Sequence, residues 1–238
     1  MVETGTRRDR MRAATVREIT QTARHILVTE GPDAVTLRAI AREMGMTAPA
    51  LYRYFDSHQE LLRHVVGELF TELTDDIERA IRAVPENVLK MKFYAASAEF
   101  RRWALDHKRE YALLFGTPLP GGEDGAQEDW TAECGRRFGL TFVALILELW
   151  HTKPFPVPAD DEIDPGFRTQ IERYRRELGV LDLPLGVIVV FLSCWIRLQG
   201  FVTLEVFGHM SFALDDSGPM FDLMMHDLAD RLGLTHDL

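Results

Sequence analysis

Hydrogen-bond donors are crowded into the twelve residues from Thr47 to His58, which read TAPALYRYFDSH. Hydroxyl groups and arginine donate readily to phosphate oxygens, and arginine also pairs with the edge of guanine. Small residues beside them let the backbone approach closely, and an alanine methyl packs well against the methyl group of thymine. This chemistry suits a surface that touches a nucleic acid. The candidates are Thr47, Ala48, Pro49, Ala50, Tyr52, Arg53 and Tyr54.

A pair of short helices must position these residues, and the local sequence predicts such a pair. Thr36 can cap the first helix, and Thr47 can cap the second. Gly45, between the two, favours a sharp left-handed turn. Leu51 and Phe55 are expected to face inward, which leaves the polar residues around them exposed. In a helix-turn-helix of this kind the second helix enters the major groove of DNA.

The rest of the chain follows the helical period, and we find no convincing alternating strand, so the fold class is all-α. The first helix is expected to end at Gly31-Pro32. A capping box from Ser57 to Glu60 opens a fourth helix that ends near Pro85. Loops are expected over 116–127 and 153–166. Further helices are expected over 86–106, 128–150, 167–178 and 184–208, and a last one after Gly218-Pro219.

Charge is distributed unevenly along the chain, whose net charge is −10. Residues 1–65 hold ten arginines against eight acidic residues, a balance of +2, and the remainder carries −12. A basic head on an acidic body favours an anionic partner at one end only.

We expect a cytoplasmic protein that does not span a membrane. The first residues are polar, unlike a signal peptide. The apolar run Leu183–Ile196 is shorter than the ~18–20 residues that a membrane span needs, so we interpret it as a buried helix. Cys134 and Cys194 form no spaced set, and we expect both to be reduced and buried.

The segment TLRAIAREMGMTAPALYRYFDSHQELL, residues 36–62, resembles the DNA-binding domain of the TetR family of bacterial transcriptional regulators, and the likeness covers about residues 15–65. It implies a three-helix domain, here 1–65 with a basic N-terminal arm, and a larger helical-bundle domain for ligand binding and dimerisation, here 66–238. The family commonly has lysine where this chain has His58, which implies a weaker and pH-dependent phosphate contact. The arginine-rich arm, residues 7–12, is expected to compensate by reaching into a minor groove. The resemblance implies DNA contacts at Thr36, Arg38, Thr47, Ala48, Pro49, Ala50, Tyr52 and Tyr54, to which we add Arg53 and His58.

The C-terminal part resembles a subgroup with a Trp-x-x-Leu-His-Gly-like motif, in which Trp195, Leu198 and Gly200 fit and Gln199 replaces the histidine. The family implies a dimeric repressor that leaves a palindromic operator when a small molecule binds. We expect a homodimer through the last two long helices, by the stripe Val187, Val190, Phe191, Cys194, Trp195, Leu198, Phe201, Val202 and Phe221 to Leu232. The alternative is that this stripe packs inside one chain.

Bulky residues of the larger domain, accompanied by a few polar groups, are typical of a pocket for a small lipophilic ligand, although plain core packing is the alternative for each. The candidates are Phe100, Trp103, His107, Tyr111, Phe142, Leu145, Trp150 and Trp195.

An enzyme and a helical scaffold are the competing interpretations. The sequence contains no G-x-S-x-G, H-E-x-x-H, P-loop or G-x-G-x-x-G motif, and we predict no catalytic residue, metal or cofactor. His107 and Glu110 have a spacing that some metal sites use, but a solvated or ion-paired helix face accounts for them better. A scaffold would leave the tyrosine-rich short helix unexplained.

Overall fold

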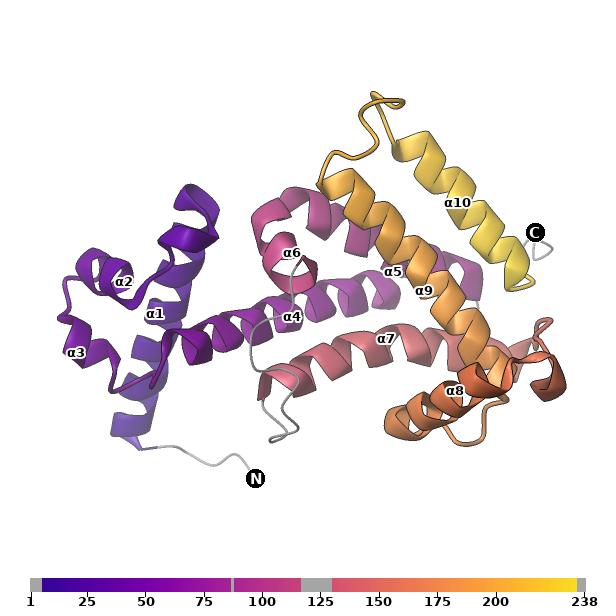
Figure 1. Cartoon of the computed structure of the whole chain (residues 1–238), viewed down its shortest axis with the longest axis horizontal. Coiled ribbons are helices and arrows are strands. Elements are labelled where there is room, and N and C mark those ends of the chain that lie inside the picture. Colours follow the sequence, from indigo (N-terminus) through magenta and orange to yellow (C-terminus); the bar gives the residue numbers. More distant parts are fainter. Residues whose placement is uncertain (1–5, 87, 117–129, 235–238) are drawn as a thin grey trace. The chain divides into compact units, whose positions relative to one another are not determined.

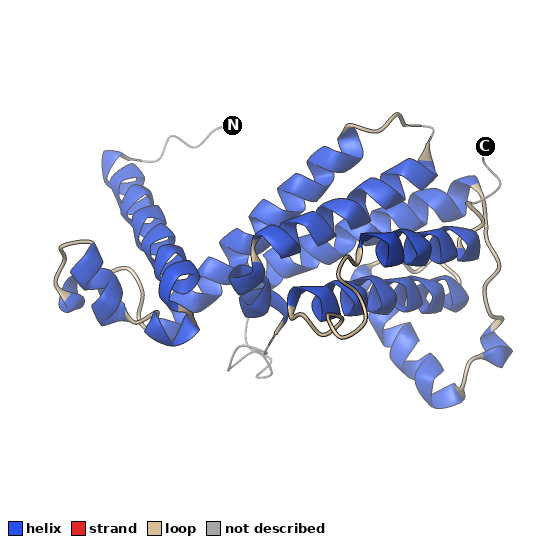
Figure 2. Cartoon of the chain, turned by 90° about the horizontal axis from the view of Figure 1, so that it is seen from above, coloured by secondary structure: helices blue, strands red, loops and turns tan. Residues whose placement is uncertain are grey.

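The computed structural model describes residues 6–86, 88–116 and 130–234, which form helices and loops without a β-strand (Figure 2). The all-α prediction is therefore confirmed. Most of the predicted loop 116–127 and the first two residues of the predicted helix 128–150 lie outside the described residues. The α-helices are α1 (Arg7–Glu30), α2 (Leu37–Glu43), α3 (Ala48–Leu51), α4 (His58–Arg82), α5 (Leu89–Asp106), α6 (Lys108–Phe115), α7 (Trp130–Thr152), α8 (Pro165–Leu178), α9 (Leu185–Val206) and α10 (Gly218–Arg231) (Figure 1).

The chain divides into two compact units. The head unit comprises residues 1–72 and 107–136, and the body unit comprises residues 73–106 and 137–238. The head unit thus contains α1, α2, α3 and α6, together with the first parts of α4 and α7. The division at residues 65 and 66 stays a prediction.

Local capping explains where the helices of the head unit begin and end. Thr36 Oγ1 accepts a hydrogen bond from the amide of Ala39 at 3.1 Å, and Ser57 Oγ accepts one from the amide of Glu60 at 3.0 Å. Gly31, with φ of 97°, ends α1. The two side-chain acceptors satisfy amides that lack a partner in the first turn of a helix. The predicted starts of α2 and α4 and the predicted end of α1 are therefore confirmed.

The core of the body unit is built on α9. This helix is long and apolar enough to cross a membrane by length and composition, but 56% of its most apolar window is buried. It packs against α5 and α8, as a central helix of a bundle does. The interpretation of Leu183–Ile196 as a buried helix agrees with this packing, although the apolar helix continues to Val206.

An ionic cluster joins α5 to the α9–α10 segment of the body unit. Arg101 Nε donates to Glu205 Oε2 at 2.7 Å, Ser217 Oγ donates to the same carboxylate, and the Arg101 guanidinium lies over the Phe221 ring at 4.8 Å. Burial raises the pKa of Glu205, but the hydrogen bonds from Arg101 and Ser217 outweigh it and hold the pKa below its ordinary value. The carboxylate is therefore a stabilising partner in the folded state.

The lowered pKa of Glu205 predicts how stability responds to acid. A carboxyl with a lowered folded pKa contributes stability above its ordinary value of 4.5, and this is lost as the pH falls through the folded pKa. We expect Glu205→Gln to lower the Tm at pH 7 by about 5 °C and to lower it much less near pH 3.5. Circular dichroism melts over this range test it, with the exposed Glu133→Gln as control. A Tm difference that is constant with pH would contradict the expectation.

Candidate nucleic-acid interface

The second short helix, α3, is held to the head unit by its apolar residues. Leu51 is fully buried and Phe55 is 3% exposed, as predicted. Gly45 has φ of 65°, and the amide of Met46 donates to the carbonyl of Ala41 at 2.8 Å, so the chain reverses sharply between α2 and α3. Glycine adopts this left-handed conformation cheaply, which explains its place in the turn.

The surface of α3 is open to solvent. Thr47 precedes the helix, but its side chain makes no capping hydrogen bond, so the prediction that the Thr47 side chain caps α3 is wrong. The Thr47 side chain and Pro49 in the first turn are exposed. Ala48 and Ala50 are half-buried. The predicted contacts on α2, Thr36 and Arg38, are also exposed.

Helix α3 ends at Leu51, and a tight turn follows it. The amides of Arg53 and Tyr54 donate to the carbonyls of Ala50 and Leu51 at 3.3 and 2.9 Å. Tyr52 is 53% exposed, Arg53 is exposed and Tyr54 is half-buried. The α3 surface, meaning residues 47–50 and the turn 52–54, therefore gathers the seven candidates that the sequence pattern indicated.

His58 starts α4 in a different environment. Its side chain is half-buried, and within the described residues its Nε2 is buried without a hydrogen-bond partner. A phosphate contact from this ring would have to use Nδ1. The amides of Glu60 and Leu61 already donate to Ser57, which leaves those of His58 and Gln59 at the N-terminus of the helix as the donors for a phosphate.

The prediction of an arginine-rich arm over residues 7–12 is wrong. Residues 7–12 are the first turns of α1, not an extended arm that can enter a minor groove. A capping box starts the helix, in which Thr6 Oγ1 accepts from the amide of Asp9 at 3.2 Å and the Asp9 carboxylate accepts from the amide of Thr6 at 2.9 Å. Hydrogen bonding from Thr6 lowers the pKa of Asp9. The spacing Thr-x-x-Asp was the signal for this start.

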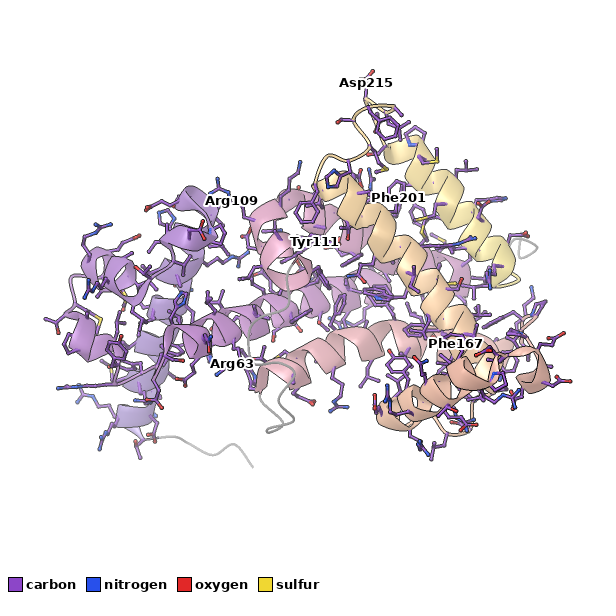
Figure 3. The ribbon with its side chains drawn as sticks, in the orientation of Figure 1. Arg63, Arg109, Tyr111, Phe167, Phe201 and Asp215 are labelled. Atoms are coloured by element: carbon purple, nitrogen blue, oxygen red, sulfur yellow. The ribbon has the colours of Figure 1, made fainter. Side chains whose placement is uncertain are left out.

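Helix α6 is tied to α1 within the head unit. Arg109 donates from Nη1 to the carbonyl of Val28 at 2.5 Å, at the end of α1 where carbonyls lack helical partners. Glu110, 4% exposed, accepts from Arg24 Nε at 3.2 Å. Arg109 and Tyr111 both lie on α6 (Figure 3). Of the two options for Glu110, the ion-paired one holds and the solvated one does not, because this side chain is buried.

The ligand candidates fall in both units. His107 and Tyr111 belong to the head unit, and the other six belong to the body unit. There, Phe100, Phe142 and Trp195 form an aromatic cluster with Phe138, which the sequence reasoning missed, and all six pairs of ring centroids lie 5.4–6.3 Å apart. Trp103 is fully buried, Leu145 is buried, and Trp150 makes an edge-to-face contact with Phe155 instead. The pocket itself stays a prediction.

The prediction that the apolar stripe of the last two long helices forms the dimer contact is also wrong for most of its residues. Phe221 is 2% exposed, and Val187, Val202, Leu228 and Leu232 are fully buried inside the chain. Most of the stripe therefore packs within one chain, which was the alternative. Other apolar residues of α9 and α10 are exposed, namely Ile196, Leu204, Met220 and Leu223.

Comparisons with known proteins match two parts of the chain. A family model described as bacterial regulatory proteins of the tetR family matches residues 19–65, and a tetracyclin repressor-like C-terminal domain matches residues 93–228. The HTH-type transcriptional regulators Rv1816 of Mycobacterium tuberculosis and Mb1846 of Mycobacterium bovis are each 32% identical over 219 residues, 92% of both chains.

Solved structures share the fold. The crystal structure of SCO4313 is 28% identical, with a TM-score of 0.73 over 94% of this chain and 100% of its own. A protein of unknown function from Rhodococcus sp. RHA1 has a TM-score of 0.65 at 20% identity, over 97% of this chain and 95% of its own.

Proposed function

Because the chain belongs to the TetR family of bacterial transcriptional regulators, we propose that it is a homodimeric repressor that leaves a palindromic operator when a small molecule binds. It is a DNA-binding regulator by family, and its relatives are transcriptional regulators. We place its action in the cytoplasm, beside its operator. We expect it to bind its ligand without turning it over.

The α3 surface carries this proposal. It presents hydroxyl groups and a guanidinium around small residues, on a segment that the buried Leu51 and Phe55 hold to the head unit. Such a surface can approach base edges through Ala48, Pro49 and Ala50 while Thr47, Tyr52 and Tyr54 donate to phosphates. Arg53 can reach either. Thr36 and Arg38 on α2 and the N-terminus of α4 at His58 supply contacts to the flanking backbone.

A ligand would enter the aromatic cluster of the body unit. Phe100, Phe142 and Trp195 come from α5, α7 and α9, so a molecule inserted between them would separate three helices at once. The lining is apolar, which favours a small lipophilic ligand with few polar groups.

Binding to operator DNA tests the proposal. We expect a gel-shift of the wild-type chain on its own upstream intergenic DNA, or on a duplex selected from random DNA, which weakens as salt rises. No preference over scrambled DNA in either experiment would contradict it. Release of the shifted complex by lipophilic compounds would support the ligand step.

Substitution of Tyr52 tests whether the α3 surface makes the DNA contacts. Since its hydroxyl is assigned to a phosphate, we expect Tyr52→Ala to weaken binding about tenfold to the selected and the scrambled duplex alike. Substitutions at Ala48 or Ala50 should change sequence preference instead. Fluorescence anisotropy measures both, with Tyr174→Phe on α8 as control. Unchanged affinity of Tyr52→Ala would show that α3 docks differently.

A further inference from the structure

One face of α1 packs on the head-unit core from Ile19 onward. In the first turns of the helix, before Ile19, the same face carries arginine residues. Arg12 lies seven residues before the buried Ile19, and Arg8 lies four residues before Arg12, so helical spacing puts all three on one face. Both arginines are exposed. Because residues 7–12 are helical, the backbone from which these side chains extend is held in place.

Arg12 makes two contacts with the turn that follows α3. Its Nη1 donates to the main-chain carbonyl of Arg53 at 2.9 Å, and its guanidinium carbon lies 5.3 Å from the centroid of the Tyr54 ring. One side chain therefore holds both the backbone and an aromatic ring of this turn. A guanidinium can do this because it is planar and carries several N–H donors, whereas an ammonium group is a compact point charge.

The turn depends on such support. Helix α3 has only four residues, and a helix so short is not stable by itself. Leu51 and Phe55 anchor the two ends of the segment in the core, and the three residues between them are at least partly exposed. The positions of Tyr52 and Tyr54 are thus set by the turn and by Arg12.

We propose that Arg12 is a positioning residue of the DNA interface. It holds the turn 52–54 so that the tyrosine hydroxyls meet phosphates, and its own charge is used within the protein. The inference rests on the proposed docking of the α3 surface and extends it to α1. It replaces the minor-groove arm with a support built into the first turns of the helix.

The test separates positioning from simple charge attraction. The full chain is titrated against a fluorescent duplex that the wild type selects from random DNA, with a scrambled duplex as reference, over a series of salt concentrations. Arg12→Lys keeps the charge but loses the planar stack and its hydrogen-bond geometry. We expect it to bind the selected duplex about tenfold more weakly, with the salt slope of the wild type. Arg8→Lys is the matched control and should bind like the wild type.

A double-mutant cycle with Tyr54 measures the coupling between Arg12 and the Tyr54 ring in DNA binding. A residue with only a structural role would show no such coupling. In a Tyr54→Ala background, Arg12→Lys should cost much less than in the wild type. The Tm of each variant is measured beside it, since a residue needed only for stability would lower the Tm without this coupling.

Two results would overturn the inference. If Arg12→Lys binds like the wild type while Arg12→Ala lowers the salt slope by about one, Arg12 is a phosphate contact. If Arg12→Lys costs as much without the Tyr54 ring as with it, the stacking has no role. Failure of the wild type to prefer its selected duplex would instead remove the proposed function, and this inference with it.

Discussion

Arg24→Met should lower the free energy of unfolding by about 2–3 kcal/mol. Arg24 binds Glu72 on α4 with two hydrogen bonds, from Nη1 at 2.5 Å and from Nη2 at 3.1 Å, and it binds Glu110 on α6 through Nε. Removing the arginine leaves the Glu110 carboxylate, whose side chain is only 6% exposed, without its cation. The cost lies below that of a fully buried pair because the Arg24 side chain is 30% exposed.

Urea unfolding followed by circular dichroism measures this change. Arg136→Met is the matched control, because Arg136 pairs with Glu133 at the surface, and we expect it to change stability by less than about 0.5 kcal/mol. Combining Arg24→Met with Glu110→Met should recover much of the loss, since the buried charge is then gone. A double variant as unstable as the sum of its parts would show that packing, and not the uncompensated charge, is lost.

The Arg24 network also explains why α6 belongs to the head unit. Arg24, Arg109 and their partners join α1, α4 and α6 through side chains that are distant in sequence. The sequence shows these residues as ordinary charges on helix faces. Nothing in their spacing says that Arg24 and Glu110 meet, so His107 and Tyr111 were grouped with the ligand candidates of the body unit.

The α3 surface could be predicted because its signals are local. Capping by Thr36, the glycine turn at Gly45 and the inward pair Leu51 and Phe55 each act within a few residues. The start of α1 is set just as locally, by the capping box of Thr6 and Asp9, and the run of arginines that follows obscures this signal in the sequence. Capping and turn residues determine where a helix begins and ends, so these boundaries can be predicted without knowing the tertiary contacts.

The surface of α9 could not be predicted because this helix is apolar on more than one side. Periodicity shows that a face is apolar, but it does not say whether that face meets the same chain or another. The stripe with Val187, Leu198 and Val202 is the more continuous one and is used inside the body unit. The less continuous set, Ile196 and Leu204, stays exposed.

That exposed set supports the dimer that we propose. Ile196 is 67% exposed and Leu204 is 46% exposed, eight residues apart on α9 with the exposed Gly200 between them. On α10, Met220 and Leu223 are 43% and 56% exposed, three residues apart. Apolar residues at helical spacing on two neighbouring elements of the sequence suit a four-helix contact between two copies of the chain.

Leu204→Glu should therefore convert the dimer to a monomer of 27.2 kDa and weaken binding to a palindromic duplex at least about 100-fold. A charge at this position must be desolvated twice in a symmetric interface, because each copy contributes the same residue. Loss of the dimer removes the second half-site contact, while affinity for a single half-site should stay the same. Light scattering after size exclusion gives the mass, and anisotropy with full and half-site duplexes gives the affinities.

Met91→Glu is the matched control for this prediction, because Met91 is 54% exposed on α5 and lies outside α9 and α10. It should leave both the mass and the affinity unchanged. If Leu204→Glu stays dimeric, the interface uses another surface, and if both variants dissociate, general loss of apolar surface explains the effect. Leu204→Glu could also be monomeric and still bind the palindrome like the wild type. That result would contradict the argument that two linked heads bind the two half-sites together, on which the proposal of a palindromic operator depends.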